Sequence, residues 1–280
     1  MKHTEGKGFE RLAFDSLFEL TDFISLEDNR HHDAEYASIH GSESFTGTED
    51  MEQALSLFES GDADLMKAID QRDVEANDVS GFVENVKRSF VNDVVGFIPN
   101  VANAVMGIPT NMIRMNKVYH KQKILNIAIN IAVSSGVEKD DMIKNASIMY
   151  AAVDSLEKQG YRCNVWVTEV ANGRDVNHTF TVRVKTDGQP FNRLKMAFPM
   201  ANPSMLRRFG FAINERSKHW IGGGYGTPMR GEEAEKEIKE TLGFDNVYVI
   251  DLMKLKSTGI KGLKQGALDL EIGKYKGDVE

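Results

Sequence analysis

The chain has 280 residues, of which 41% are hydrophobic and 27% are charged, and its formal net charge is −8 with a pI of about 5.5. This length and composition allow one large domain or two small ones with a buried core. The acidic balance argues against wholesale binding of nucleic acid or anionic membranes, although it leaves room for a local basic patch.

The cysteine content and the hydropathy pattern indicate where the protein is made. Cys163 is the one cysteine, so no intrachain disulfide can form, and we expect it to be a small core residue. The first residues lack the apolar stretch of a secretory signal, and no run approaches the roughly 20 apolar residues of a membrane span. We therefore expect a soluble protein from a reducing cytoplasm, with no membrane partner.

Residues 1–115 are predicted to form a helical N-terminal region. Apolar residues recur at helical spacing within 9–26, and Thr48 is a good N-cap for a second helix that ends at Gly61. A further helix is expected over residues 63–90. Carboxylates dominate much of this region, which we interpret as an exposed helical surface or, alternatively, as an acidic face for a basic partner.

The apolar segment 94–118 closes this region and is interrupted by helix-breaking residues. These residues are Gly96, Pro99, Gly107 and Pro109. Proline bars a continuous helix, and glycine allows a close approach of two backbones. We therefore predict a buried connector that packs the N-terminal region onto the rest of the chain, and the alternative is an interaction groove.

Strand patterns alternate with helix patterns over residues 116–253. Strand 123–133 is apolar on both faces, a helix follows it, and strands 161–170 and 179–185 come next. A charged helix and another buried strand complete the pattern. This alternation predicts an α/β fold with a mostly parallel sheet between helices, followed by a basic tail over residues 254–280.

The turn after strand 123–133 contains Asn130, Ala132 and Ser134. Ligands of open α/β sheets bind beyond the carboxyl ends of the strands, and this pattern resembles the metal-binding domain of the von Willebrand factor A type. That domain would have Asp, Ser and Ser here, which present a carboxylate and two hydroxyls to Mg²⁺. Asn130 supplies only a neutral amide and Ala132 supplies no ligand, which leaves the hydroxyl of Ser134 or Ser135. We therefore predict a von Willebrand A-like domain with a degenerate site, no bound metal and no cofactor.

Several segments resemble an uncharacterised protein family of tailed bacteriophages. These segments are "FTGTEDMEQALSLFESGD", "GFIPNVANAVMGIPTNM", "INIAVSSGV", "DSLEKQGYRCNV", "VRVKTDG", "NPSMLRRFGF" and "GYGTP", and they lie within residues 9–250. The resemblance implies a phage origin, an α/β core and a location in the host cytoplasm, with virion association left open, and it implies no activity. Such relatives tend to have Asn-x-Ser-x-Ser at the strand end, so Ala132 is a departure.

Basic residues cluster in segment 193–220 with few acidic residues between them. The cluster consists of Arg193, Lys195, Arg207, Arg208, Arg216, Lys218 and His219, with Trp220 beside it. Arginines next to an aromatic ring can bind phosphates and stack a base. The alternative is a solvated helix face whose arginines pair with carboxylates of the N-terminal helices.

Two other patterns indicate less. The glycine run 222–226 is not followed by the Lys and Ser or Thr of a phosphate-binding loop, so we interpret it as a flexible loop. Acidic residues and a histidine near strand ends, among them Glu169 and His178, match neither a nuclease spacing nor a catalytic triad.

These patterns together favour a non-enzymatic phage protein that binds a host or phage protein. We expect the binding residues to be Asn130, Ser134 and Ser135 at the edge of the sheet, together with the basic segment 193–220. The alternative is a nucleic-acid-binding protein that uses the same basic surface. An enzymatic function would require a metal, and the sequence leaves the partner and the oligomeric state open.

Overall fold

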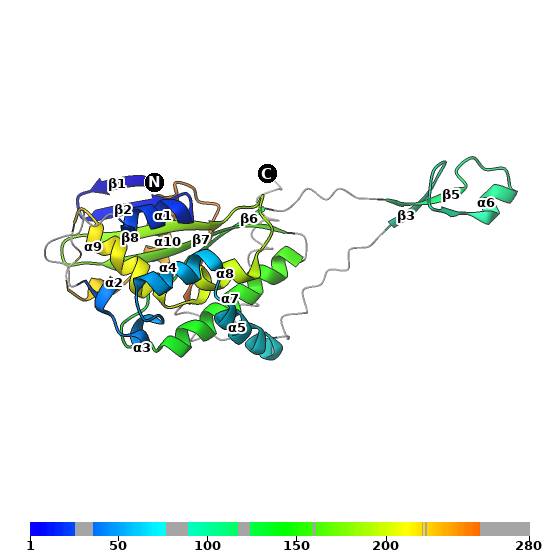
Figure 1. Cartoon of the computed structure of the whole chain (residues 1–280). Coiled ribbons are helices and arrows are strands. Elements are labelled where there is room, and N and C mark those ends of the chain that lie inside the picture. The colour runs from blue at the N-terminus through cyan, green and yellow to red at the C-terminus, as the bar shows by residue number, and fades with distance from the viewer. Residues whose placement is uncertain are drawn as a thin grey trace. The chain divides into compact units, whose positions relative to one another are not determined.

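The computed structural model describes residues 1–25, 36–76, 89–116, 124–158, 161–219, 221 and 223–252 (Figure 1). The chain divides into two compact units, one made of Met1–Ser80 and Ile124–Glu280 and the other of Gly81–Lys123. We call the first the α/β unit, and we call the described residues of the second, 89–116, the arm.

A mixed sheet of seven strands runs through the described part of the α/β unit in the order β1-β2-β8-β7-β6-β10, with β9 also paired to β7. The strands are β1 (Lys2–Gly6), β2 (Phe9–Phe14), β6 (Ile124–Asn130), β7 (Arg162–Asn172), β8 (Asn177–Lys185), β9 (Thr227–Pro228) and β10 (Tyr248–Asp251). β10, β6 and β7 run parallel, β8 is antiparallel to β7, and β2 is parallel to β8. The α/β class and the parallel centre of the sheet, flanked by helices, are as the sequence predicts.

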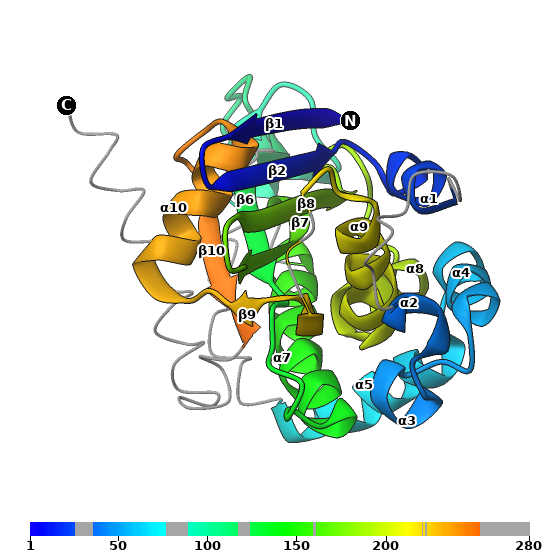
Figure 2. The same cartoon turned by 90° about the vertical axis from the view of Figure 1, so that its left-hand side faces the viewer.

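Helices cover both faces of this sheet (Figure 2). They are α1 (Leu17–Ser25), α2 (Ala37–His40), α3 (Glu43–Thr46), α4 (Met51–Ser60), α5 (Ala63–Ala76), α7 (Lys139–Lys158), α8 (Arg193–Ala201), the π-helix η3 (Met205–Gly210), α9 (Phe211–Arg216), the short 3-10 helix η4 (Gly223–Tyr225) and α10 (Gly231–Leu242). The helix α10 packs on one face against Trp166 and Val170, whereas α7 and α8 pack on the other. Because neighbouring side chains of a strand point to opposite faces, β7 contributes to both cores.

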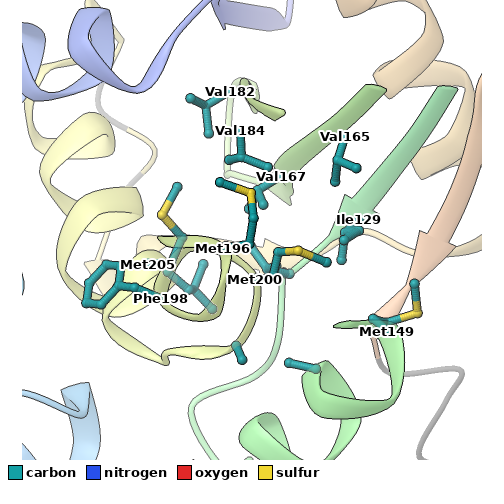
Figure 3. Packing of buried hydrophobic residues seen from close by; sticks show 14 of the residues in the cluster. Ile129, Met149, Val165, Val167, Val182, Val184, Met196, Phe198, Met200 and Met205 are labelled. Atoms are coloured by element: carbon teal, nitrogen blue, oxygen red, sulfur yellow. The ribbon is translucent and has the colours of Figure 1, made fainter. Parts of the chain in front are cut away.

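The larger core lies between the sheet and α8 (Figure 3). Ile129 and Val167 of the sheet are completely buried there, and Met200 of α8 is 2% exposed. Apolar residues of α7 recur at helical spacing and are also buried, among them Met142 and Met149. Cys163 is buried and reduced, as predicted.

The N-terminal residues differ from the prediction. Residues 9–26 were expected to be helical, but they begin with β2 and only then continue into α1. In β2, Leu12 and Phe14 are buried at two-residue spacing because the strand pairs with β8. β1 and β2 lie within the region 1–115 that was predicted to be helical, and both are strands of the main sheet.

The prediction of a Thr48 cap is also wrong. The N-cap of α4 is Asp50, whose Oδ1 accepts a hydrogen bond of 2.7 Å from the backbone N–H of Gln53. Thr48 is instead buried, and its hydroxyl contacts that of Ser204 at 2.9 Å. The end of α4 at Gly61 is as predicted.

The arm is a small sheet with the strand order β3-β5-β4. Its elements are β3 (Ser89–Asp93), β4 (Ile98–Pro99), the short helix α6 (Val101–Val105) and β5 (Met112–Asn116). No side chain of residues 90–114 is buried. The arm therefore forms no buried core of its own. The expected helical turn is present as α6, and the packing of 94–118 onto the rest of the chain stays a prediction.

Candidate functional site

The predicted edge of the sheet is present, but its amide is already used within the protein. Asn130 ends β6 and is completely buried. Its Oδ1 accepts a hydrogen bond from the backbone N–H of Ala132 at 3.2 Å, and its Nδ2 donates to the carbonyl of Met229 at 3.3 Å. Ser134 and Ser135 are exposed in the following turn. Of the three predicted binding residues, the two serines are therefore accessible and Asn130 is not.

A carboxylate that the sequence analysis missed lies beside this amide. Asp251 ends β10 and is the register partner of Asn130 in the parallel pair of β10 with β6. Its side chain is 7% exposed. The segment "YVID" predicted a buried strand, but nothing in the local pattern showed which strand would lie next to it. Among the described residues, no three His, Cys, Asp or Glu side chains lie close enough together to hold a metal ion.

The two arginines at the centre of the basic segment are structural. Arg207 and Arg208 lie in the π-helix η3 and are 2% and 0% exposed. Arg208 donates to the hydroxyl and to the carbonyl of Thr48, both at 2.6 Å, and to the carbonyl of Ser38 at 3.0 Å. Arg207 donates to the carbonyl of Val137 at 2.5 Å. These guanidinium groups bind backbone segments from distant parts of the chain and cannot reach a phosphate.

The other basic residues do not complete an exposed surface either. Arg216 is buried and donates to the carbonyl of Ala212 at 3.0 Å. Arg193 donates to the carboxylate of Asp70 in α5 at 2.6 Å. This contact agrees with the alternative prediction that arginines of the segment pair with carboxylates of the N-terminal helices. The remaining positions are Lys195, Lys218 and His219, which are exposed, and Trp220, which lies outside the described residues. The prediction of one continuous basic surface is therefore wrong.

A polar network lies under α9 at one end of the sheet. The hydroxyl of Ser217 lies 2.5 Å from Nε2 of His178, and the amide of Asn214 donates to Glu169 at 3.4 Å. Burial raises the pKa of Glu169 to about 8 and lowers the pKa of His178 to about 4, so both groups are neutral near pH 7. Serine beside histidine can act as nucleophile and base, but a nucleophile needs substrate access, and these side chains are 4% and 1% exposed.

Glu10 extends this network toward the end of α9. Its two carboxylate oxygens accept hydrogen bonds from the backbone N–H groups of Lys218 and His219, at 2.9 and 2.8 Å. Glu10 is completely buried, and His3 lies 3.0 Å from it. The network therefore anchors the segment after α9 to β2. The burial of Glu10 could have been predicted from the two-residue spacing of Glu10, Leu12 and Phe14 if the segment had been recognised as a strand.

The arm has the surface that differs most from the rest of the molecule. Nine large apolar side chains are exposed on it, by 37% to 82%: Phe90, Val94, Val95, Phe97, Ile98, Val101, Val105, Met106 and Ile108. Large apolar side chains that gather on one surface are a feature of interaction sites. The only charged residues of the arm, Asp93 and Arg114, form an ion pair at 2.9 Å, so this surface is neutral.

The exposed surface of the arm belongs to a defined local structure. β3 and β5 pair over five residues, and the rings of Phe90 and Phe97 lie 6.2 Å apart. The side chain of Asn100 caps α6 through the backbone N–H of Asn103. The amide of Asn103 donates to the carbonyl of Thr110 at 3.0 Å. The arm therefore presents its apolar side chains on a preformed backbone.

The comparisons with known proteins assign a family without an activity. A family model described as "Domain of unknown function (DUF7192)" matches residues 5–259, which is most of the chain. No curated protein and no solved structure matches the chain. Within the described residues, none of the helices combines the length and the hydropathy needed to cross a bilayer.

Proposed function

The chain belongs to the DUF7192 family, and we propose that it is a non-enzymatic protein that binds a partner through its arm, residues 89–116. One observation carries this proposal: nine large apolar side chains are exposed on the arm, and no side chain of residues 90–114 is buried. A unit of fewer than roughly 40 residues rarely folds stably without additional support. A partner that covers the apolar side chains would provide the missing core.

The α/β unit serves as the scaffold in this proposal, and we assign it as a von Willebrand A-like domain with a degenerate site. The parallel crossover β6-α7-β7 supports the assignment, because it follows the order of strand, turn, helix and strand expected for that domain. The buried amide of Asn130, bonded to Ala132 and Met229, supports a site that holds no cation. Ser134 and Ser135 remain available for a secondary contact.

A host or phage macromolecule is the kind of partner that the resemblance to tailed-phage proteins suggests, and the host cytoplasm is the corresponding location. The alternative of nucleic-acid binding depended on the basic segment 193–220. The structure does not favour nucleic-acid binding by this segment, because Arg207 and Arg208 are buried and bonded to backbone carbonyls.

The proposal is tested by affinity isolation of the tagged full-length protein from cells that produce it. The arm variant Val101→Asp/Val105→Asp places two charges on α6, at positions that are 67% and 82% exposed. The control variant Phe18→Asp places a charge on α1 of the α/β unit, at an apolar side chain that is 80% exposed. We expect the wild type and the control to retain the same partner and the arm variant to lose it.

Two outcomes contradict the proposed function. In one, the arm variant retains the same bound material as the wild type. In the other, the wild type retains nothing above an untagged background in either the aqueous or the membrane fraction. Circular dichroism is the control for folding. Because all three substituted side chains are exposed, both variants should give the spectrum of the wild type.

A further inference from the structure

Two described residues other than glycine have a positive φ, and they lie at one place in the α/β unit. Tyr36, with a φ of 53°, is the N-cap of α2, and Tyr225, with a φ of 59°, ends η4 between Gly224 and Gly226. Left-handed backbone is unfavourable for a residue with a side chain, and it persists where the surrounding contacts enforce it. The contacts around α2 therefore hold the backbone in two unfavourable conformations.

The carboxylate of Glu215 holds the beginning of α2, which lies beside α9 (Figure 2). Glu215 is completely buried, and its Oε1 accepts hydrogen bonds from the backbone N–H of Ser38 at 3.0 Å and from the hydroxyl of Tyr225 at 2.7 Å. Its Oε2 accepts a hydrogen bond from the hydroxyl of Ser38 at 2.5 Å. The hydroxyl of Tyr225 in turn accepts from the backbone N–H of Ala37 at 2.8 Å. One carboxylate therefore ties both α2 and Tyr225 to α9.

The guanidinium of Arg208 holds the other end of α2. It donates to the carbonyls of Ser38, Ile39 and Gly41, at 3.0, 3.3 and 3.2 Å. A carboxylate at the N–H end of a helix and a guanidinium at its C=O end match the orientation of the helix dipole. Two charged side chains, one from α9 and one from η3, therefore bind the backbone of α2 at its two ends.

Apolar burial contributes little to this attachment. Ser38 is the buried side chain of α2, whereas Ala37 and Ile39 are half-buried. A helix of four residues is not stable by itself, because its few hydrogen bonds do not offset the cost of ordering the first turn. Segments that bury few apolar side chains open with a smaller free energy than the core of the same protein. The position of α2 therefore depends on its hydrogen bonds to Glu215, Tyr225 and Arg208.

We propose that segment 36–41 and Tyr225 form a latch that opens by local unfolding while the rest of the α/β unit stays folded. Opening removes the backbone strain at Tyr36 and Tyr225 and breaks the hydrogen bonds of Ser38 to Glu215. It uncovers the carboxylate of Glu215 and leaves Arg208 bonded to Thr48. The latch is a conformational device of the α/β unit and does not depend on the proposed role of the arm.

Amide hydrogen exchange, followed by NMR on the purified full-length protein, tests the latch. The probe is the N–H of Ser38, and the reference is the N–H of Val167, which lies in the completely buried part of β7. In the regime where exchange reports the opening equilibrium, we expect the probe to exchange at least roughly 100-fold faster than the reference. Low concentrations of urea should accelerate the reference but not the probe, because a local opening exposes little surface.

A core variant separates local opening from global unfolding. Ile238 is completely buried in α10, which packs on the opposite face of the sheet. Ile238→Val destabilises the closed and the open latch equally relative to the unfolded chain. It should therefore raise the exchange rate of the Val167 N–H about 5-fold and leave that of the Ser38 N–H unchanged.

A latch variant tests the role of the tyrosine hydroxyl. Tyr225→Phe removes the hydroxyl but keeps the ring, which stacks on a phenylalanine ring of α9 with 4.0 Å between centroids. It should raise the exchange rate of the Ser38 N–H about 10-fold, the factor expected when a hydrogen bond to a charged group is lost. Tyr150→Phe is the matched control, because it removes a tyrosine hydroxyl that contacts Met66, and it should leave the rate of the Ser38 N–H unchanged.

Four results overturn the latch. The first is a Ser38 N–H that responds to urea in parallel with the Val167 N–H, and the second is equal acceleration of both by Ile238→Val. Either result shows that α2 is released only by global unfolding. The third is an unchanged rate of the Ser38 N–H in Tyr225→Phe. The fourth is a Ser38 N–H that exchanges in the wild type as fast as in an unfolded peptide, since a closed latch would then not form.

Discussion

The two units contain similar apolar residues and use them in opposite ways. In the α/β unit, Val165, Val167 and Met149 repeat at strand or helix spacing and are completely buried. In the arm, valine, phenylalanine and methionine are more frequent than in the α/β unit, but glycine and proline interrupt any period and no described side chain is buried. The spacing of apolar residues therefore predicts burial within the chain better than the apolar content does.

The largest difference in stability is expected when one phenylalanine is removed from each unit. Phe198 is completely buried and packs its ring against those of Phe58 and Phe209, at 5.8 and 5.6 Å. Phe198→Ala should lower the free energy of unfolding of the α/β unit by about 3–5 kcal/mol, because it leaves a cavity. Phe97→Ala in the arm removes a ring that is 57% exposed and should change that free energy by less than about 0.5 kcal/mol.

Urea unfolding followed by far-UV circular dichroism measures both changes. Equal losses in the two variants would show that the stability of the α/β unit depends on the arm, which would contradict the difference in burial between Phe198 and Phe97. A loss below about 1 kcal/mol for Phe198→Ala would contradict the tight packing of its site.

The same contrast explains what the sequence could predict. β6, α7, β7 and β8 were predicted because their apolar spacing is a local property that matches their burial. Arg207 and Arg208 were assigned to a surface because arginine is usually exposed, and their burial depends on carbonyls far away in sequence, such as those of Val137 and Thr48. The register of Asp251 beside Asn130 is likewise a long-range property.

The sequence of the arm does not show what covers its apolar side chains, for a related reason. An apolar segment with glycine and proline has the same local pattern whether the rest of the chain or an external partner covers it. Segment 94–118 was predicted to be buried because burial inside the chain is the more frequent outcome. The structure shows that the described residues of the arm bury none of these side chains among themselves.

The buried polar contacts of Arg208 are expected to stabilise the α/β unit. It donates to carbonyls of Ser38, Gly41 and Thr48 and to the hydroxyl of Thr48. Arg208→Ala would leave these groups without their donor in a buried site, so we expect a loss of about 3 kcal/mol in the free energy of unfolding. Lys218→Ala, which removes an exposed ion pair with Glu5, is the control and should leave the free energy of unfolding close to that of the wild type. Similar losses in the two variants would show that the buried contacts contribute little.

The buried carboxyl under α9 makes the stability of the scaffold depend on pH. Burial raises the pKa of Glu169 from 4.5 to about 8, so between these values the folded protein keeps a proton that the unfolded chain has lost. Stability therefore falls as pH rises through that window. Burial lowers the pKa of His178 from 6.5 to about 4. The stability that His178 contributes therefore falls as pH decreases below 6.5, which offsets the pH dependence due to Glu169 in that range.

Of these two groups, only Glu169 titrates between pH 6.5 and 8, where its ionisation should lower the free energy of unfolding of the wild type by about 2 kcal/mol. Glu169→Gln cannot ionise and keeps the contact with Asn214, so it should remove this slope. Denaturation midpoints at several pH values measure the difference. A variant whose midpoints fall as steeply as those of the wild type would assign the pH dependence to another group.

The smallest effect is expected at the edge of the sheet that the sequence singled out. Ser134 and Ser135 are exposed, and the amide beside them is bonded within the protein, so their hydroxyls have no structural role that the described contacts reveal. Ser134→Ala/Ser135→Ala should change the free energy of unfolding by less than about 0.5 kcal/mol. In the affinity isolation experiment it should behave like the wild type, in contrast to the variant of Val101 and Val105. If the serine variant loses the partner while the arm variant keeps it, the sheet edge and not the arm is the binding surface, and the exposed apolar side chains need another explanation.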